Sequence, residues 1–362
     1  MSRLARWLWE TEGRSARLAR LALSPAALGV GAVAAMRSSV YRSGGRRRVT
    51  LPRPVVSVGN LSVGGTGKTP LASWAGNFFA GRGVRPAILL RGYGHDEGDI
   101  HRRTVPGAIV IEDADRAAAG RRAADAGADV IILDDGFQRL DVERDLDIVL
   151  VAAESLSGSR WMLPAGPWRE GWNALERADL AVVTSKRAGH EAVARTHRRV
   201  RAAVRPGCAV GSASLRISAL EGLTIGGSLD PRLLQGASVL ASAGVADPAS
   251  LVHQLRDLGA RVELLAWPNH HAYRPADLDR IVRVGSHADF VVVTEKDATK
   301  LRSVWPEGAR DPLVVRLQVI WEEGREVVEE ALRRALCGPL VPRGEAIEPS
   351  ELNEAARADA NL

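Results

Sequence analysis

The chain of 362 residues is poor in cysteine, aromatic residues and lysine, and each shortage excludes some classes of function. Its two cysteines, Cys208 and Cys337, lie far apart without ligand-like spacing, which argues against a disulfide framework or a cysteine zinc site and fits a reducing compartment. Aromatic residues make up 4%, and the net charge of +6 is carried almost entirely by arginine. Without a basic patch interleaved with aromatics, we expect no nucleic-acid partner.

Long apolar runs are also scarce, and the clearest one lies near the N-terminus. The uncharged stretch LALSPAALGVGAVAAM, residues 21–36, is shorter than the ~20 strongly apolar residues that cross a bilayer. Arginines at helical spacing precede it, and an arginine cluster suited to anionic headgroups of the cytoplasmic leaflet follows. We predict that residues 1–45 form a membrane-associated helical segment, peripheral or monotopic. The alternative is an ordinary core helix with a solvated arginine face.

A glycine-rich stretch, VGNLSVGGTGKTP at residues 58–70, joins a predicted strand to a predicted helix. Backbone N–H groups of such a turn and the helix N-terminus bind phosphates, the lysine reaches the terminal phosphates and the threonine hydroxyl can ligate Mg²⁺. Ser62 stands where the strict pattern wants glycine, and a chance glycine turn is the alternative. The pattern predicts nucleotide binding through Gly64, Gly65, Thr66, Gly67, Lys68 and Thr69.

From residue 54 onward, buried-strand runs alternate with helical patterns, which indicates βαβ units and a mostly parallel sheet. An extended crossing at about residues 215–236 separates two such cycles. A chain of this length, with 46% hydrophobic residues, can build two cores. We predict an α/β protein with two α/β/α sandwich domains facing each other across a cleft. Residues 46–218 form a P-loop NTPase-type domain, residues 219–342 close the cleft, and residues 343–362 form a disordered tail.

Two carboxylates end the strand in VIILDDGFQ, at the edge where parallel sheets bind ligands. Asp134 and Asp135 could merely cap the next segment, but with a P-loop upstream they are candidates to hold Mg²⁺. Other polar residues follow predicted strands or, for Arg169, a Gly-Pro turn, and are ambiguous one by one. These are Asp96 and Glu97 in HDEGD, Arg116 in EDADR, Arg169 in GPWRE and His270 in WPNHHAY.

Six stretches follow one another along the chain in the order VGNLSVGGTGKTP, RGYG, LDDGFQ, LPAGPWRE, WPNHH and TEKD. Together they resemble tetraacyldisaccharide 4'-kinase, the lipid A 4'-kinase of outer-membrane bacteria. The resemblance runs from the N-terminal apolar segment to about residue 320. It implies transfer of the ATP γ-phosphoryl group to the 4'-hydroxyl of a tetraacyldisaccharide 1-phosphate, with Mg²⁺, on the cytoplasmic face of the inner membrane. The lipid A precursor and the membrane surface are the implied partners, and no protein partner is evident.

The resemblance also implies roles for single residues. Lys68 matches the P-loop lysine, Asp96 the base and His270 its partner, whereas Arg116 resembles the arginine that steadies transition-state charge. Substrate contacts are expected from Glu97, Arg169 and Asn60. Three features depart from the family pattern. The insertion after RGYG is largely missing, and His95 and Gly98 flank the acidic pair in place of glycine and proline. Trp267 and Asn269 replace the usual phenylalanine and aspartate, which is a milder change.

Two other classes of function are consistent with the residues. A membrane-associated P-loop ATPase switch would hydrolyse ATP without a phosphorylated product. A P-loop kinase or ligase of a small metabolite would use the N-terminal segment only for packing.

Overall fold

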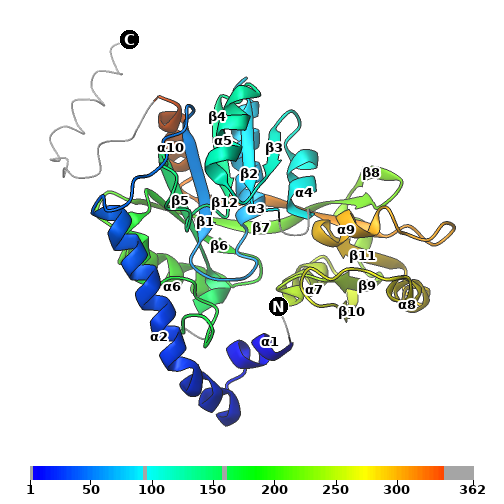
Figure 1. Cartoon of the computed structure of the whole chain (residues 1–362). Helices are drawn as coiled ribbons and strands as arrows, with labels where there is room; N and C mark the ends of the chain where they lie inside the picture. The colour runs from blue at the N-terminus through cyan, green and yellow to red at the C-terminus, as the bar shows by residue number, and fades with distance from the viewer. Residues whose placement is uncertain (1–2, 93–95, 157–160, 338–362) are drawn as a thin grey trace.

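The computed structural model describes residues 3–92, 96–156 and 161–337 and shows one mixed sheet with helices on both faces (Figure 1). In this part of the chain the sheet has twelve strands, of which eleven follow the order β10-β9-β11-β12-β7-β6-β5-β1-β4-β2-β3. The tail expected at 343–362 lies outside the described residues.

Seven strands of the first half run parallel, from β3 at the edge to β7. Most are apolar and buried on both faces, as expected of a parallel sheet covered by helices. Their bounds are β1 Val55–Asn60, β2 Pro86–Leu90, β3 Ile109–Glu112, β4 Val130–Asp134, β5 Leu146–Ala152, β6 Leu180–Ser185 and β7 Ala209–Gly222.

Helices cover both faces of these strands because alternate strand residues point to opposite sides. Val56 packs with α3 (Lys68–Ala80) and α10 (Arg325–Leu336), whereas its neighbour Val55 packs with α5 (Arg116–Asp125). On the same side as α5, α6 (His190–Arg201) covers β5 and β6. Helix α4 (Asp96–Thr104) lies beyond β2 and contacts α3, β3 and α9. Short 3₁₀ helices are η1 Ala153–Leu156, η2 Trp172–Arg177 and η3 Pro231–Leu234.

Two long strands carry the sheet into the second half. Strand β7 pairs antiparallel with β12 (Leu313–Glu323), and β11 (Phe290–Thr294), β9 (Ser238–Ala243) and β10 (Arg261–Ala266) continue parallel beyond it. Strand β8 (Gly226–Leu229) forms a hairpin with β7. The covering helices are α7 Pro248–Asp257, α8 Pro275–Gly285 and α9 Glu295–Leu301.

The α/β class with a mostly parallel sheet and helices on both faces is therefore confirmed. The two halves are connected more extensively than the predicted crossing indicated. Strand β7 runs through positions 218 and 219, so the sheet is continuous there, and α10 packs Val328, Leu332 and Ala335 into the core of the first half. Sequence pattern alone gives no signal for this return of the chain.

The N-terminal segment forms α1 (Arg3–Glu10) and α2 (Arg14–Arg42), and α2 runs along one side of the first half (Figure 1). At 29 residues, α2 is longer than the uncharged run because it includes arginines at both ends. It is the one helix in the described part of the chain that is long and apolar enough to cross a membrane, judged by length and composition. Only 6% of its most apolar window is buried in the protein.

Candidate active site

The P-loop lies between β1 and α3, at the carboxyl end of the first-half strands. Gly67 caps α3 with φ 95°, a left-handed conformation that glycine adopts without strain, and a Cβ there would lie 2.4 Å from Leu215. Asn60, expected to contact substrate, is instead fully buried beneath the loop. Its side-chain amide donates to Ser62 O and to Thr66 Oγ1, each at 2.7 Å. Asn60 therefore holds the shape of the loop from inside.

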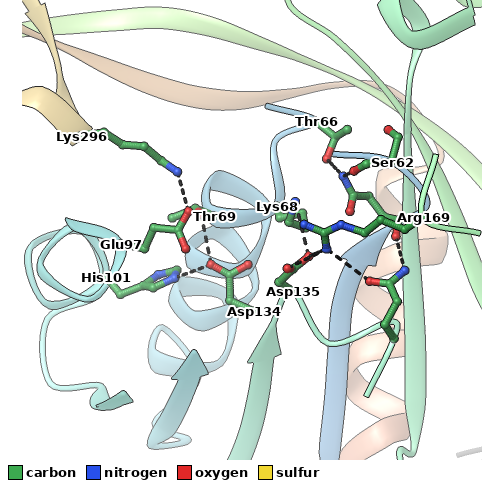
Figure 2. Close-up of polar contacts among 12 residues, drawn as sticks. Ser62, Thr66, Lys68, Thr69, Glu97, His101, Asp134, Asp135, Arg169 and Lys296 are labelled. Atoms are coloured by element: carbon green, nitrogen blue, oxygen red, sulfur yellow. Dashed lines mark hydrogen bonds and ion pairs between the residues drawn. The ribbon is translucent and has the colours of Figure 1, made fainter. Parts of the chain in front are cut away.

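Thr69 and Asp134 meet behind the loop, as the sequence predicted, and a third residue joins them (Figure 2). The Thr69 hydroxyl lies 3.1 Å from Asp134 Oδ2, and His101 Nε2 lies 2.9 Å from the same oxygen. Burial alone would raise the pKa of Asp134, but the hydrogen bond and charge of His101, together with Lys68, hold it below its ordinary value. Asp134 is thus a carboxylate that accepts both hydrogen bonds.

This corner fits a magnesium ion. The Thr69 hydroxyl donates a hydrogen bond to Asp134, so the lone pairs of Thr69 Oγ1 stay available to a cation. Asp134 Oδ1 is buried without a hydrogen-bond partner among the described residues. Mg²⁺ prefers such oxygen ligands and takes much of its shell from water and phosphates. No group of three or more His, Cys, Asp or Glu side chains in the described ranges could hold a metal by itself.

Asp135, the second acid, faces two cations rather than Thr69 (Figure 2). Lys68 Nζ lies 3.4 Å from Asp135 Oδ1, and Arg169 NH1 contacts both carboxylate oxygens at 3.0 and 2.9 Å. Burial opposes ionisation, but Lys68 and Arg169 hold the pKa of Asp135 below its ordinary value. Its φ of 56° is left-handed, a conformation that costs energy for a residue other than glycine and is concentrated at functional sites.

Asp96 and His270 come together from opposite halves of the chain. His270 Nδ1 lies 3.1 Å from Asp96 Oδ2, and Lys300 Nζ lies 3.3 Å from that oxygen. Asp96 is 1% exposed, yet its Oδ1 has no hydrogen-bond partner among residues that the structure describes. Burial would raise the pKa of Asp96, but His270, Lys300 and Lys296 hold it below its ordinary value. His270, with φ 58°, is the other described non-glycine residue with positive φ.

Glu97 and Arg116 take separate positions. Glu97 Oε1 lies 2.5 Å from Lys296 Nζ, again across the two halves (Figure 2). Burial alone would lower the pKa of Lys296, but the neighbouring Glu97 carboxylate outweighs this effect and raises it. Arg116 is 2% exposed and donates to Asp113 O. Burial and nearby Arg139 lower the pKa of Arg116 to about 10 against the pull of Asp134 and Asp135. A guanidinium with that pKa is still charged at neutral pH.

A cavity of about 970 Å³ opens between the halves, a volume at the upper end for small-molecule sites. It is lined by the P-loop, by Glu97, Asp135, Arg169 and His270, and by apolar residues of β7 and β12 such as Ile217 and Val319. Asp134, Asp96 and Arg116 lie behind this lining. The arrangement combines a phosphate-binding loop, an acidic corner that fits Mg²⁺ and a separate ionised carboxylate. These are the groups that phosphoryl transfer to an alcohol requires.

Several residues of the site could not be identified from the sequence. His101 lies in HDEGDIHRR, five positions after Asp96, and its Nδ1 reaches Ser73 Oγ at 2.9 Å. Lys296 and Lys300 lie in TEKDATK, where α9 follows β11, and the sequence assigned neither of them a role. His95, which precedes the predicted base, lies outside the described residues. Four-residue spacing on α9 could have shown that Lys296 and Lys300 share one helix face.

Comparison with known proteins gives a consistent result. The family model of the LpxK tetraacyldisaccharide-1-P 4'-kinases matches residues 19–105 and 96–337. The tetraacyldisaccharide 4'-kinase of Anaeromyxobacter sp. (strain K) is 38% identical over 366 residues, covering 93% of this chain and 96% of that protein. That of Pelobacter propionicus is 36% identical and covers 83% of this chain and 88% of its own length.

A solved structure is similar over nearly the whole fold. LpxK from Aquifex aeolicus, determined in complex with ATP, superposes with a TM-score of 0.68 at 25% sequence identity. The match covers 88% of this chain and 99% of the Aquifex chain.

Proposed function

Because the chain belongs to the tetraacyldisaccharide 4'-kinase family, it is an ATP-dependent kinase of lipid A biosynthesis, and we propose the residues that perform its reaction. The reaction transfers the γ-phosphoryl group of ATP to the 4'-hydroxyl of tetraacyldisaccharide 1-phosphate. The observation that carries the assignment of the base is the ionised Asp96 with one carboxylate oxygen bound to His270 and Lys300 and the other unpartnered.

In the proposed mechanism, Asp96 Oδ1 accepts the proton of the 4'-hydroxyl while the hydroxyl oxygen attacks the γ-phosphorus, the bond from that phosphorus to the β–γ bridging oxygen breaks, and ADP leaves. A carboxylate with a lowered pKa is a weak base. That suffices because the transition state of phosphoryl transfer is loose and the proton leaves late. The main task of Asp96 is to orient the hydroxyl, and His270 and Lys300 keep its carboxylate ionised and fixed.

The second component is electrostatic. Lys68 leaves Asp135 to contact the β- and γ-phosphates, and Arg116 adds a positive charge behind Asp134 and Asp135. Thr69 and Asp134 would hold Mg²⁺, and Asp135 orients Lys68 and Arg169 beside it. When bound, the ion neutralises charge between the β- and γ-phosphates. We assign Arg169 and Glu97, both on the cavity wall, to contacts with the acceptor.

Access to Asp96 requires movement. Its free oxygen is buried, and the residues that cover it, His270 and Lys300, belong to the second half. We propose that residues 219–324 move relative to residues 46–218 to admit the sugar, and that closure restores the Asp96–His270 hydrogen bond. Bending of the long β7–β12 pair, which has register shifts near Arg316 and Trp321, would allow this motion.

We further propose that α2 associates with the cytoplasmic face of the inner membrane. It exposes large apolar side chains, including Leu18, Leu28 and Met36 at 66%, 68% and 63%, and it has arginines at both ends. Such a helix stays with an acylated substrate that does not leave the bilayer. Its length of about 40 Å is compatible with crossing as well as with lying in the interface.

Transfer of labelled phosphate from γ-labelled ATP to the glycolipid tests the assignment. Wild-type protein should label the lipid, and Asp96→Asn should bind ATP but label it far more slowly. Equal labelling by the two proteins would remove Asp96 from the role of base.

A further inference from the structure

The chain contains only four lysines among its 49 basic residues, and all four lie at the active site. Lys68, Lys186 and Lys296 line the cavity, and Lys300 pairs with Asp96. Arginine and lysine differ at such positions because an ammonium is a compact point charge on a flexible stem. A sequence that uses arginine elsewhere and lysine here places a compact cation at each of these points.

Three of these lysines have carboxylate partners: Lys68 with Asp135, Lys296 with Glu97 and Lys300 with Asp96. Lys186 differs, since its ammonium forms no salt bridge with any residue in the described ranges. Burial lowers the pKa of the Lys186 ammonium, Asp247 and Glu154 oppose this from beyond ion-pair distance, and Lys296 and Lys68 repel it. A desolvated cation without a counter-charge is costly unless a bound anion completes it.

The position of Lys186 is tightly defined. Its Nζ lies 2.9 Å from the point that a Cβ on Gly65 would occupy, so the ammonium rests against the middle of the P-loop. Two residues earlier, at the end of β6, the Thr184 hydroxyl donates to Thr66 O at 2.8 Å. The end of β6 thus fixes the backbone of the loop and places a positive charge beside it.

The turn that carries Lys186 is also preorganised. Glu154 Oε1 accepts the backbone N–H groups of Lys186, Arg187 and Ala188 at 2.8, 2.9 and 3.0 Å. The carbonyl of Lys186 accepts from Gln254 of α7 at 3.3 Å, which links the turn to the second half. A side chain on so well anchored a turn loses little further backbone entropy when it binds a ligand.

The sheet order indicates which part of the nucleotide lies there. Strand β6 is on one side of β1, and β4 and β2, which lead to Asp134 and α4, are on the other. The acceptor and the γ-phosphate therefore belong on the α4 side, beside Lys68 and Thr69. The rest of the nucleotide extends toward β6.

We infer that Lys186 is a nucleotide-binding residue whose ammonium contacts the α- or β-phosphate or the ribose, the part of ATP that remains in ADP. Lys68 and Lys186 then hold the two ends of the polyphosphate from opposite sides of the loop. This inference rests on the proposed function only in taking ATP as the ligand.

The direct test is calorimetric titration of ATP and of ADP, each with Mg²⁺ and without glycolipid, into wild type, Lys186→Met and Arg187→Met. Methionine keeps the length of the lysine stem without its charge. Arg187, on the same turn and outside the cavity lining, is the matched control. We expect Lys186→Met to raise Kd for ATP and for ADP by the same factor, about 10- to 100-fold, as for a lost charge-assisted hydrogen bond. Arg187→Met should leave both unchanged.

A Kd for Lys186→Met within about twofold of wild type would overturn the inference, as would a loss for ATP without a loss for ADP. If Lys186→Met does not fold, amine acetylation of wild-type protein read by mass spectrometry replaces it: ADP should protect Lys186, and acetylation unaffected by ADP would overturn the inference. Wild type that binds ATP but phosphorylates no glycolipid would refute the proposed function while leaving this test intact.

Discussion

Asp96 and His270 lie 174 positions apart in the chain and are joined by a contact of 3.1 Å between Asp96 Oδ2 and His270 Nδ1. One residue begins α4 in the first half and the other lies in the loop after β10 in the second. The contact therefore reports whether the two halves are closed. In the proposed mechanism, a base that is completed only by the opposite half couples chemistry to closure.

Replacing either member of the pair should affect turnover more than nucleotide binding. We expect Asp96→Asn to lower kcat by about 10²- to 10⁴-fold, which is the usual contribution of a general base to the rate. His270→Ala should lower it less, about 10- to 100-fold, because it mispositions Asp96 without removing it. Steady-state kinetics with ATP varied should show KM for ATP within a few-fold of wild type. A fall in ATP affinity that matches the fall in kcat would contradict this account.

The pH dependence of kcat/KM should reveal the environment of Asp96. Its folded-state pKa lies below the ordinary value of 3.8, so protonation of Asp96 should produce no acid limb above about pH 4. Lys300→Met removes one counter-charge while burial remains, so the pKa of Asp96 rises and the limb should move to higher pH. Lys300→Arg, which keeps the charge, is the control. An unchanged profile in Lys300→Met would show that Lys300 does not act on Asp96.

The same linkage predicts a change in stability. A carboxyl whose pKa is lowered on folding stabilises the protein above its unfolded pKa, and this stabilisation disappears as pH falls through the folded value. The difference in thermal unfolding between wild type and Lys300→Met should therefore be larger at pH 7 than near pH 3. Differential scanning calorimetry at both pH values measures it, and a difference independent of pH would contradict the charge interaction.

His101 should act through the metal corner. Its bond to Asp134 Oδ2 orients the carboxylate, and loss of such a supporting hydrogen bond typically costs 10- to 100-fold in metal affinity or activity. His101→Ala should raise the Mg²⁺ concentration needed for half-maximal activity by about that factor. His101→Gln should restore part of it by donating from its amide. His197→Ala, at a half-buried histidine on α6, is the control and should behave as wild type.

The exposed apolar side chains of α2 should govern membrane attachment. Changing Leu18, Leu28 and Met36 to serine removes about 1.5–3 kcal/mol of apolar burial per residue and should abolish sedimentation with anionic phospholipid vesicles. Serine at Val304, Ile320 and Val327, which are similarly apolar and half exposed elsewhere, should leave sedimentation unchanged. Equal sedimentation of the two triple variants would contradict a role for α2.

The sequence identified those parts of the site that depend on local patterns. The P-loop and the strand-end pair Asp134 and Asp135 follow from strand, turn and helix order, so Thr69 and Asp134 could be placed together in advance. Asp96 and His270 were paired only through the family resemblance. Lys186, His101 and Lys300 could not be assigned, because their roles depend on side chains brought together across the sheet and no short motif records such contacts.

The same limit applies to the fold. Alternating apolar runs revealed the parallel strands, since each strand is recognisable in isolation. The return of α10 to the first-half core depends on where β12 leads the chain. That path is set by the pairing of β12 with β7, whose partner residues are about 100 positions apart, as Ala219 and Arg316 illustrate.

Phosphorus NMR and mass spectrometry of the product formed from purified protein, ATP, Mg²⁺ and tetraacyldisaccharide 1-phosphate test the central claim most directly. The account predicts a glycolipid that has gained one phosphate as a monoester at the 4'-position, formed by wild type and not by Lys68→Met. Hydrolysis of ATP with unmodified glycolipid, or a phosphate at another hydroxyl, would contradict it.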